Sequence, residues 1–147
     1  MSLYIIRAAI LDDAPQVGAI LSAWVDETPW MVRIYSHAAD QNHAAMLVRR
    51  GWVSVACLDG GVAGFLARDG SEIHALYVAR GARGRGLGKA LLKCAKQQSD
   101  HLGLWTFQAN IRAQAFYLRE GFCEVARSDG ADNDEGLPDI RYEWRRL

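Results

Sequence analysis

Residues 76–92, LYVARGARGRGLGKALL, combine a short apolar run, a glycine-rich turn and the start of a helix with an apolar face. The N–H groups in the first turn of a helix have no partner within the helix, and this end of the helix carries partial positive charge. Arg83, Arg85 and Lys89 add further positive charge to the turn. The segment therefore predicts a site for a phosphate-containing ligand, between a strand and a helix.

Two familiar phosphate motifs do not fit the spacing of this turn. A P-loop requires Gly, four residues and then Gly-Lys-Ser/Thr, but Arg83 occupies the first glycine position and Ala90 the position of the hydroxyl. The dinucleotide motif Gly-x-Gly-x-x-Gly begins at Gly84 and Gly86, but Lys89 occupies its third glycine position. The pattern that remains is Arg-x-x-Gly-x-Gly.

A second motif follows at residues 110–122, NIRAQAFYLREGF, which fill every position of the pattern Asn-x-x-Ala-x-x-Phe-Tyr-x-x-x-Gly-Phe. In this order, the two motifs resemble those of the GNAT N-acetyltransferase superfamily, whose first motif holds the pyrophosphate of acetyl-CoA. The resemblance extends from Ile5 to Trp144, and its specific motifs lie between Glu72 and Phe122.

The resemblance implies how the chain holds acetyl-CoA as a co-substrate. Backbone groups of Leu76, Tyr77 and Val78 are expected to bind the pantetheine arm and the thioester, with the N–H of Val78 facing the thioester carbonyl oxygen. Asn110 is expected to bind the pantetheine, to cap the following helix, or both. The pyrophosphate loop is expected to comprise Arg83, Gly84, Arg85, Gly86, Leu87, Gly88 and Lys89, and the second motif is expected to contribute Asn110, Ala113, Phe116 and Tyr117 to the same site.

The resemblance also assigns candidate catalytic residues. Tyr117 aligns with the tyrosine that protonates the coenzyme A thiolate. Two candidates for the general base, Glu72 and His74, are expected to share one face of a strand with Leu76 and Val78, because side chains alternate along a strand. An unperturbed histidine titrates close to neutral pH and can accept a proton. A chain of water molecules is a third alternative, and the sequence leaves the choice open.

The acceptor side is less well specified by the sequence. The resemblance places Trp24, Trp30, Met31 and Tyr35 at the acceptor groove, where aromatic rings hold an apolar stem or stack on a cation. The alternative is that these residues belong to the core, where such aromatic side chains are more often found. Acidic residues between positions 129 and 139 are interpreted as a solvated loop, with attraction of a cationic amine as the alternative. A small amine, an antibiotic amine, a peptide N-terminus and a lysine side chain all remain open as acceptors.

Hydrophobic periodicity and turn residues predict a single mixed α/β (α+β) domain over residues 1–147. Its central sheet is expected to be mostly antiparallel and, by resemblance, splayed at one parallel pair. The strands are predicted at 3–9, 52–58, 62–68, 72–78, 104–109, 122–127 and 140–144. The four helices are predicted from the Asp12–Asp13 cap to residue 27 and at 37–50, 87–99 and 111–120.

Composition narrows the possible partners. Lys+Arg and Asp+Glu balance at 17 each, which does not favour nucleic acid or a membrane surface. The three cysteines and four histidines have no metal-ligand spacing, and neither a secretory signal nor a bilayer-spanning run is recognisable. We therefore predict a cytoplasmic enzyme without a metal, and the resemblance allows a homodimer.

The predicted function is acetyl-CoA-dependent N-acetylation of a primary amine, which attacks the thioester directly while both substrates are bound. Two alternatives remain open. One is a catalytically silent GNAT domain that binds acyl-CoA as a scaffold or sensor, and the other is an acyltransferase that uses a longer acyl-CoA.

Overall fold

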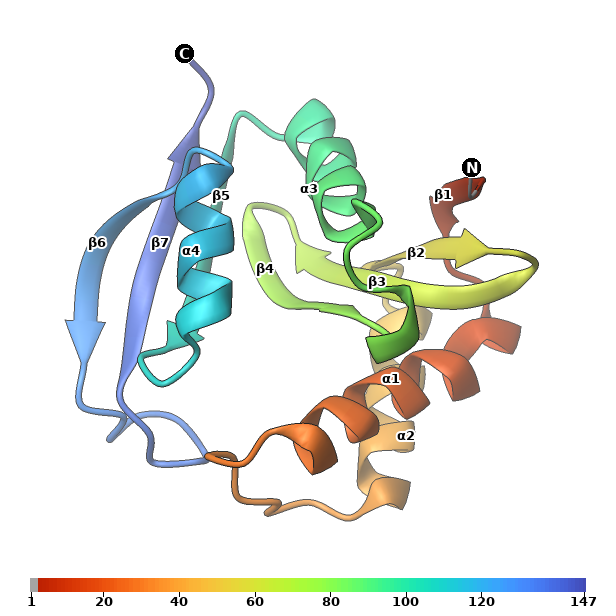
Figure 1. The fold of residues 1–147 in the computed structure, drawn as a ribbon, viewed down its shortest axis with the longest axis horizontal. Helices are drawn as coiled ribbons and strands as arrows, with labels where there is room; N and C mark the ends of the chain where they lie inside the picture. The colour runs from red at the N-terminus through yellow and green to blue at the C-terminus, as the bar shows by residue number, and fades with distance from the viewer. Residues whose placement is uncertain (1–2) are drawn as a thin grey trace.

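The computed structural model describes residues 3–147, which form one seven-stranded sheet with helices on both faces (Figure 1). The strands are β1 (Tyr4–Ala8), β2 (Val53–Leu58), β3 (Gly61–Asp69), β4 (Glu72–Val78), β5 (His101–Phe107), β6 (Cys123–Ser128) and β7 (Asp139–Arg145). The α-helices are α1 (Ala14–Glu27), α2 (His37–Arg49), α3 (Leu87–Gln98) and α4 (Ile111–Arg119), and short 3₁₀ turns are η1 (Leu11–Asp13) and η2 (Arg80–Ala82). None of these helices has the length and apolar character that crossing a bilayer requires.

The sheet order is β1-β2-β3-β4-β5-β7-β6, and β4 and β5 are its parallel neighbours. All the other neighbouring strands are antiparallel. The register between β4 and β5 consists of the pair Glu72 and Gly103, so the two strands diverge after the start of β4. The predicted fold class, a mostly antiparallel sheet splayed at one parallel pair, is confirmed.

Consecutive residues of the central strand β3 contribute to separate cores, because side chains alternate across a sheet. Phe65 packs with the residues beneath α1 and α2, while Leu66 packs with those beneath α3 and α4. Both side chains are almost fully buried, and burial of this kind stabilises the fold by about 1.5–3 kcal/mol for each side chain. The helices are thereby fixed on opposite faces of the split sheet.

The start of α1 differs from the predicted aspartate cap. The Asp13 carboxylate does not cap α1; it accepts two hydrogen bonds from the Arg7 guanidinium, at 2.7 and 3.0 Å, and one from the Ile10 N–H at 2.8 Å. Hydrogen bonding to Arg7 lowers the pKa of this buried carboxyl. Asp13 therefore ties β1 to the start of α1, and Pro15 lies in the first turn of that helix, as predicted.

Strand β4 contains a bulge that the alternation argument did not predict. Ala67 of β3 pairs with Ala75 and the next residue, Arg68, pairs with Ile73, so His74 is an extra residue without a partner in β3. Ile73 belongs to the same core as Leu76 and Val78. The prediction that Glu72 and His74 share a face with Leu76 and Val78 is therefore wrong, because the bulge shifts the alternation by one residue.

Strand β5 begins at His101, three residues before its predicted start at Leu104. Its first residues pair in register with the end of β7, from His101 opposite Arg145 to Gly103 opposite Glu143. A histidine and a glycine are weak strand signals, so tertiary pairing sets this boundary. Each of the other predicted strand and helix boundaries lies within about two residues of the observed one.

An ion pair closes the narrow end of the split. The Arg141 guanidinium of β7 extends across β5 and donates to the Glu72 carboxylate at 2.7 Å, and it also donates to Glu143 at 3.3 Å. A Cβ at Gly103 would lie 2.2 Å from this guanidinium, so the glycine leaves the space that Arg141 crosses. The ends of β4, β5 and β7 are thereby held together at the closed end.

Candidate active site

A groove of about 450 Å³ opens where β4 leaves β5. It brings together most of the residues that the two motifs predict for the cofactor, although they come from β4, the turn before α3, and α4. The predicted residues that line it are Leu76, Tyr77, Val78, Arg83, Gly88, Asn110, Ala113, Phe116 and Tyr117.

The backbone of β4 presents polar groups to this groove. The Ala79 N–H donates to the Ala63 carbonyl at 2.7 Å. Gly64 and Val78 are therefore a non-hydrogen-bonded pair of the antiparallel ladder between β3 and β4. The N–H and C=O of Val78 therefore point away from β3, toward the split, and those of Leu76 do the same. The N–H and C=O of Leu76 and the N–H of Val78 are available to an extended, amide-containing ligand, whereas the Val78 C=O accepts a hydrogen bond from Arg83.

The turn before α3 offers further backbone donors. Gly84 and Gly86 both have a φ of +81°, a left-handed conformation that glycine adopts without strain. The first hydrogen bond of α3 runs from the Ala90 N–H to the Gly86 carbonyl, so the N–H groups of Leu87, Gly88 and Lys89 precede the helical bonding pattern. The Leu87 side chain is buried in the core, and its backbone alone is available to a ligand.

Three arginines surround this turn and the groove. Arg83 folds back on β4, where its Nε donates to the Val78 carbonyl at 3.1 Å and its Nη2 lies 3.4 Å from Glu27. Arg112 and Arg119 of α4 also line the groove and were missed by the sequence analysis. Their separation by seven residues puts them on one helical face, and this periodicity is the signal that was available in the sequence.

The second motif positions Tyr117. Asn110 caps α4, since its Oδ1 accepts a hydrogen bond from the Ala113 N–H at 3.1 Å. Two turns later, Tyr117 is almost fully buried against Phe116 and Phe122 and lines the groove. Burial, with a smaller contribution from Tyr77, raises the pKa of the Tyr117 phenol, which therefore stays protonated at neutral pH.

Three aromatic residues lie where the groove, a narrow cavity and a second large cavity meet. Trp24 packs on Tyr77 with ring centroids 4.9 Å apart, and both rings line both spaces. Phe107 and Tyr77 also line a narrow cavity of about 80 Å³ between β4 and β5, which Tyr117 reaches from α4. We refer to Trp24, Tyr77 and Phe107 as the junction.

The second cavity, of about 490 Å³, is lined mainly by α1, the α1–α2 loop, α2 and the β6–β7 loop, and we refer to it as the acceptor cavity. Trp24, Met31 and Tyr35, which were predicted to lie at the acceptor groove, line this cavity, and their role toward an acceptor stays a prediction. Leu21 and Val25 of α1 extend its apolar wall. Trp30 lies against Trp24 and Phe107 and lines the neighbouring cavity beside Asn110.

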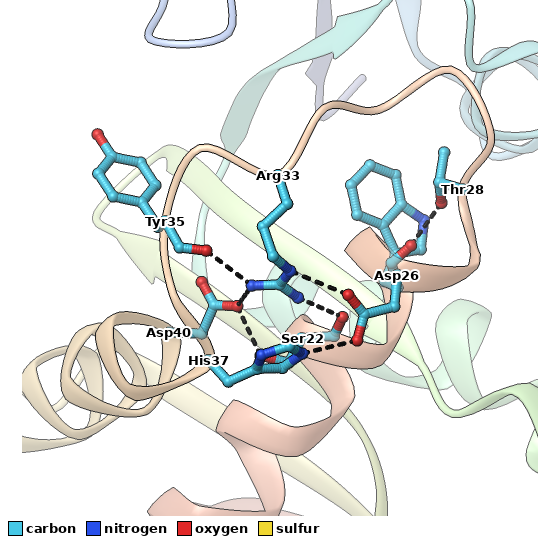
Figure 2. Close-up of polar contacts among 8 residues, drawn as sticks. Ser22, Asp26, Thr28, Arg33, Tyr35, His37 and Asp40 are labelled. Atoms are coloured by element: carbon cyan, nitrogen blue, oxygen red, sulfur yellow. Dashed lines mark hydrogen bonds and ion pairs between the residues drawn. The ribbon is translucent and has the colours of Figure 1, made fainter.

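Arg33 fixes the α1–α2 loop that forms one wall of the acceptor cavity (Figure 2). Its guanidinium donates to Asp26 at 2.9 Å, to Asp40 at 2.7 Å, and to the carbonyls of Ser22 and Tyr35, each at 2.9 Å. The Ser22 hydroxyl also donates to Asp40, at 2.5 Å. The loop is therefore tied to both α1 and α2, and the Asp40 carboxylate is engaged in this network.

A hydrogen bond joins this loop to the opposite wall. The Tyr35 hydroxyl donates to Asp134 of the β6–β7 loop at 2.7 Å. Its neighbour Glu135 lines the same cavity. The acidic segment that the sequence indicated as a solvated loop therefore contributes directly to the acceptor cavity. The sequence could not show this, because the contact joins the α1–α2 loop to the distant β6–β7 loop.

Neither predicted base lies in the acceptor cavity wall. Glu72 accepts the hydrogen bond from Arg141 at the closed end of the split. His74, the extra residue of the bulge, stacks on Trp52 with ring centroids 5.2 Å apart, although it also lines the narrow cavity between β4 and β5. Their catalytic roles stay predictions.

Comparison with known proteins agrees with this arrangement. The sequence profile of the acetyltransferase (GNAT) domain matches residues 49–124, which contain β4, the glycine-rich turn before α3, and α4. The peptidyl-lysine N-acetyltransferase YiaC of Escherichia coli (strain K12) is 33% identical over 136 residues, which cover 88% of this chain and 90% of YiaC.

This chain belongs to the GNAT superfamily of N-acetyltransferases. Solved structures of other proteins share its fold. Apo-form YjaB from Escherichia coli has a TM-score of 0.81 at 21% identity, with 99% of each chain covered. The putative acetyltransferase yncA from Salmonella typhimurium, solved with its cofactor acetyl-CoA, has a TM-score of 0.74 at 20% identity, with 98% of this chain and 94% of that chain covered. The resemblance that the two motifs indicated is confirmed.

Proposed function

We propose that this single-domain enzyme transfers the acetyl group of acetyl-CoA to the side-chain amine of a lysine in a peptide or protein. The observation that carries the proposal is the meeting of two cavities at the junction, with Tyr117 beside them. A thioester in one cavity and an amine in the other come within reach at this point. The similarity to YiaC, which is named a peptidyl-lysine N-acetyltransferase, supports the acceptor class.

The residues of the groove suit acetyl-CoA. The outward-facing backbone groups of Leu76 and Val78 match the amides of a pantetheine arm, and the N–H groups at the start of α3 match a pyrophosphate. A Cβ at Gly84 or Gly86 would meet no atom within 4 Å, so the surface above the turn is open to a ligand. The narrow cavity of about 80 Å³ between β4 and β5 favours a short acyl group.

In this proposal the amine nitrogen attacks the thioester carbon directly, without a covalent enzyme intermediate. The N–H of Val78 would stabilise the negative charge that develops on the carbonyl oxygen. Tyr117 would protonate the sulfur as the carbon–sulfur bond breaks. The buried phenol holds its proton at neutral pH, and the same burial raises the proton affinity of a thiolate beside it, which makes the transfer feasible.

The test is the variant Tyr117→Phe, which keeps the ring and its packing. We expect calorimetry to show unchanged acetyl-CoA affinity, while turnover with a lysine peptide falls by about 10- to 10³-fold. Equal turnover would make Tyr117 structural. A wild-type enzyme that binds acetyl-CoA and acetylates no amine in a broad panel would support the silent scaffold instead. The predicted cytoplasmic location and homodimer stay predictions.

A further inference from the structure

The acceptor cavity contains three carboxylates, and two of them already have partners. Asp40 binds Arg33 and the Ser22 hydroxyl, and Asp134 accepts the hydrogen bond from Tyr35. Within residues 3–147, the third, Glu135, has no cation at ion-pairing distance, although its side chain is half-buried. Its carboxylate is therefore available to a ligand that brings a positive charge.

Glu135 lines the same cavity as the three residues of the junction, where acetyl transfer is proposed. Burial, followed by the charge of Glu135, raises the pKa of the Tyr77 hydroxyl to about 12, so the carboxylate and the phenol interact electrostatically. Tyr77 in turn contributes to the raised pKa of Tyr117. Glu135 and Tyr77 line the acceptor cavity together, and Tyr77 and Tyr117 line the groove together, so the three side chains lead from the acceptor cavity to the site proposed for the thioester.

Surrounding groups make Glu135 a stronger base than an exposed glutamate. Burial raises the pKa of its carboxyl, and the neighbouring Asp134 charge raises it further. The other charged or titratable groups that line the cavity are Arg33, Tyr35, Asp40, His43 and Tyr77. Arg33 is already shared between Asp26 and Asp40, so it does not neutralise Glu135.

We propose that Glu135 binds the ammonium group of the acceptor lysine and removes its proton. This inference rests on the proposed function and identifies the base that the sequence left open between Glu72, His74 and water. The apolar side chains of Leu21, Val25 and Met31 suit the four-carbon stem of a lysine, and Glu135 suits its terminal charge.

The proton and electron balance of the step is simple. One proton moves from the ammonium to the Glu135 carboxylate, and the lone pair that remains forms the carbon–nitrogen bond with the acetyl carbon. The carbon–sulfur bond breaks, and the sulfur receives the Tyr117 proton. The nitrogen loses its second proton to water, from which Tyr117 is reprotonated. The products are an N-acetyl-lysine, a free thiol and one proton.

The experiment compares Glu135→Gln with the matched control Asp132→Asn, which removes the same charge from an exposed position of the same loop. Acetylated peptide is measured by mass spectrometry, because the exposed thiol of Cys123 would react with thiol reagents. We expect Glu135→Gln to lower kcat/KM by about 10²- to 10⁴-fold with unchanged acetyl-CoA affinity. Asp132→Asn should stay within about fivefold of the wild type.

A binding measurement separates this inference from the proposed function. Calorimetry in the presence of coenzyme A compares a lysine peptide with the same peptide carrying norleucine, which keeps the stem and lacks the ammonium. The wild type should prefer lysine by about tenfold or more, and Glu135→Gln should lose this preference. If the preference persists in Glu135→Gln, or is absent in the wild type, the inference is overturned. If the preference depends on Glu135 but no amine is acetylated, the ammonium site stands and the proposed function fails.

Discussion

Replacing Gly103 by Ala tests how the closed end of the split sheet is held. The new Cβ would lie 2.2 Å from Nη2 and 2.8 Å from Cζ of Arg141. The clashing atoms belong to the far end of a flexible side chain, so the guanidinium moves aside and the backbone does not. The cost is therefore the loss of the contacts that Arg141 makes with Glu72 and Glu143.

The size of this cost follows from the burial of the pair. The Arg141 side chain is 16% exposed and that of Glu72 is 35% exposed. Exposed ion pairs contribute about 0.2–1 kcal/mol, and hydrogen bonds to charged groups about 1.5–3 kcal/mol. We expect a loss of about 1–2 kcal/mol, offset by about 0.5–1 kcal/mol because alanine restricts the unfolded chain more than glycine.

Chemical denaturation of Gly103→Ala should therefore give a net loss of about 0.5–1 kcal/mol, or a Tm lower by about 1–4 °C. The control places the same change in an Arg141→Leu background, where no guanidinium meets the new Cβ. There Gly103→Ala should be neutral or stabilising. An equal loss in both backgrounds would refute the reasoning, because the cost would then have a source other than Arg141.

Two further predictions concern the groove and the N-terminal ion pair. At Gly88 a Cβ would make only ordinary contacts with Phe116 and Val78, so Gly88→Ala should fold normally and Gly88→Leu should fold but lose acetyl-CoA affinity in calorimetry. Asp13, whose pKa Arg7 lowers below the ordinary 3.8, stabilises the fold above that pH and loses the effect as the pH falls through its folded value. The stability difference between wild type and Asp13→Asn should accordingly shrink in acid denaturation, and a pH-independent difference would contradict this assignment.

The cofactor half of the site is predictable from the sequence because it is local. Residues 76–88 and 110–117 contain most of the residues that line the groove, in two short segments with their own turn and cap signals. The Asn110 cap, for example, needs only the N–H of Ala113, three residues later. Local hydrogen-bonding rules are sufficient for such features.

The acceptor half depends on contacts that no local pattern contains. The bulge at His74 arises from the pairing of β3 with β4 and reverses the face on which Glu72 lies. The position of Asp134 and Glu135 in the wall of the acceptor cavity depends on a loop that meets Tyr35, which lies far away in the sequence. In the sequence alone, acidic residues beside glycines indicate a solvated loop. Whether such a loop also lines a cavity becomes visible only in the folded chain.

The hydrogen bond between Tyr35 and Asp134 joins residues 99 positions apart, and this distance has a consequence for biosynthesis. During translation, the segments that form the cofactor groove emerge before the β6–β7 loop does. The acceptor cavity is complete only when that loop has left the ribosome. A nascent chain therefore acquires the groove proposed for the acyl donor before it acquires the wall proposed to receive the amine, and the proposed acetyl transfer requires both.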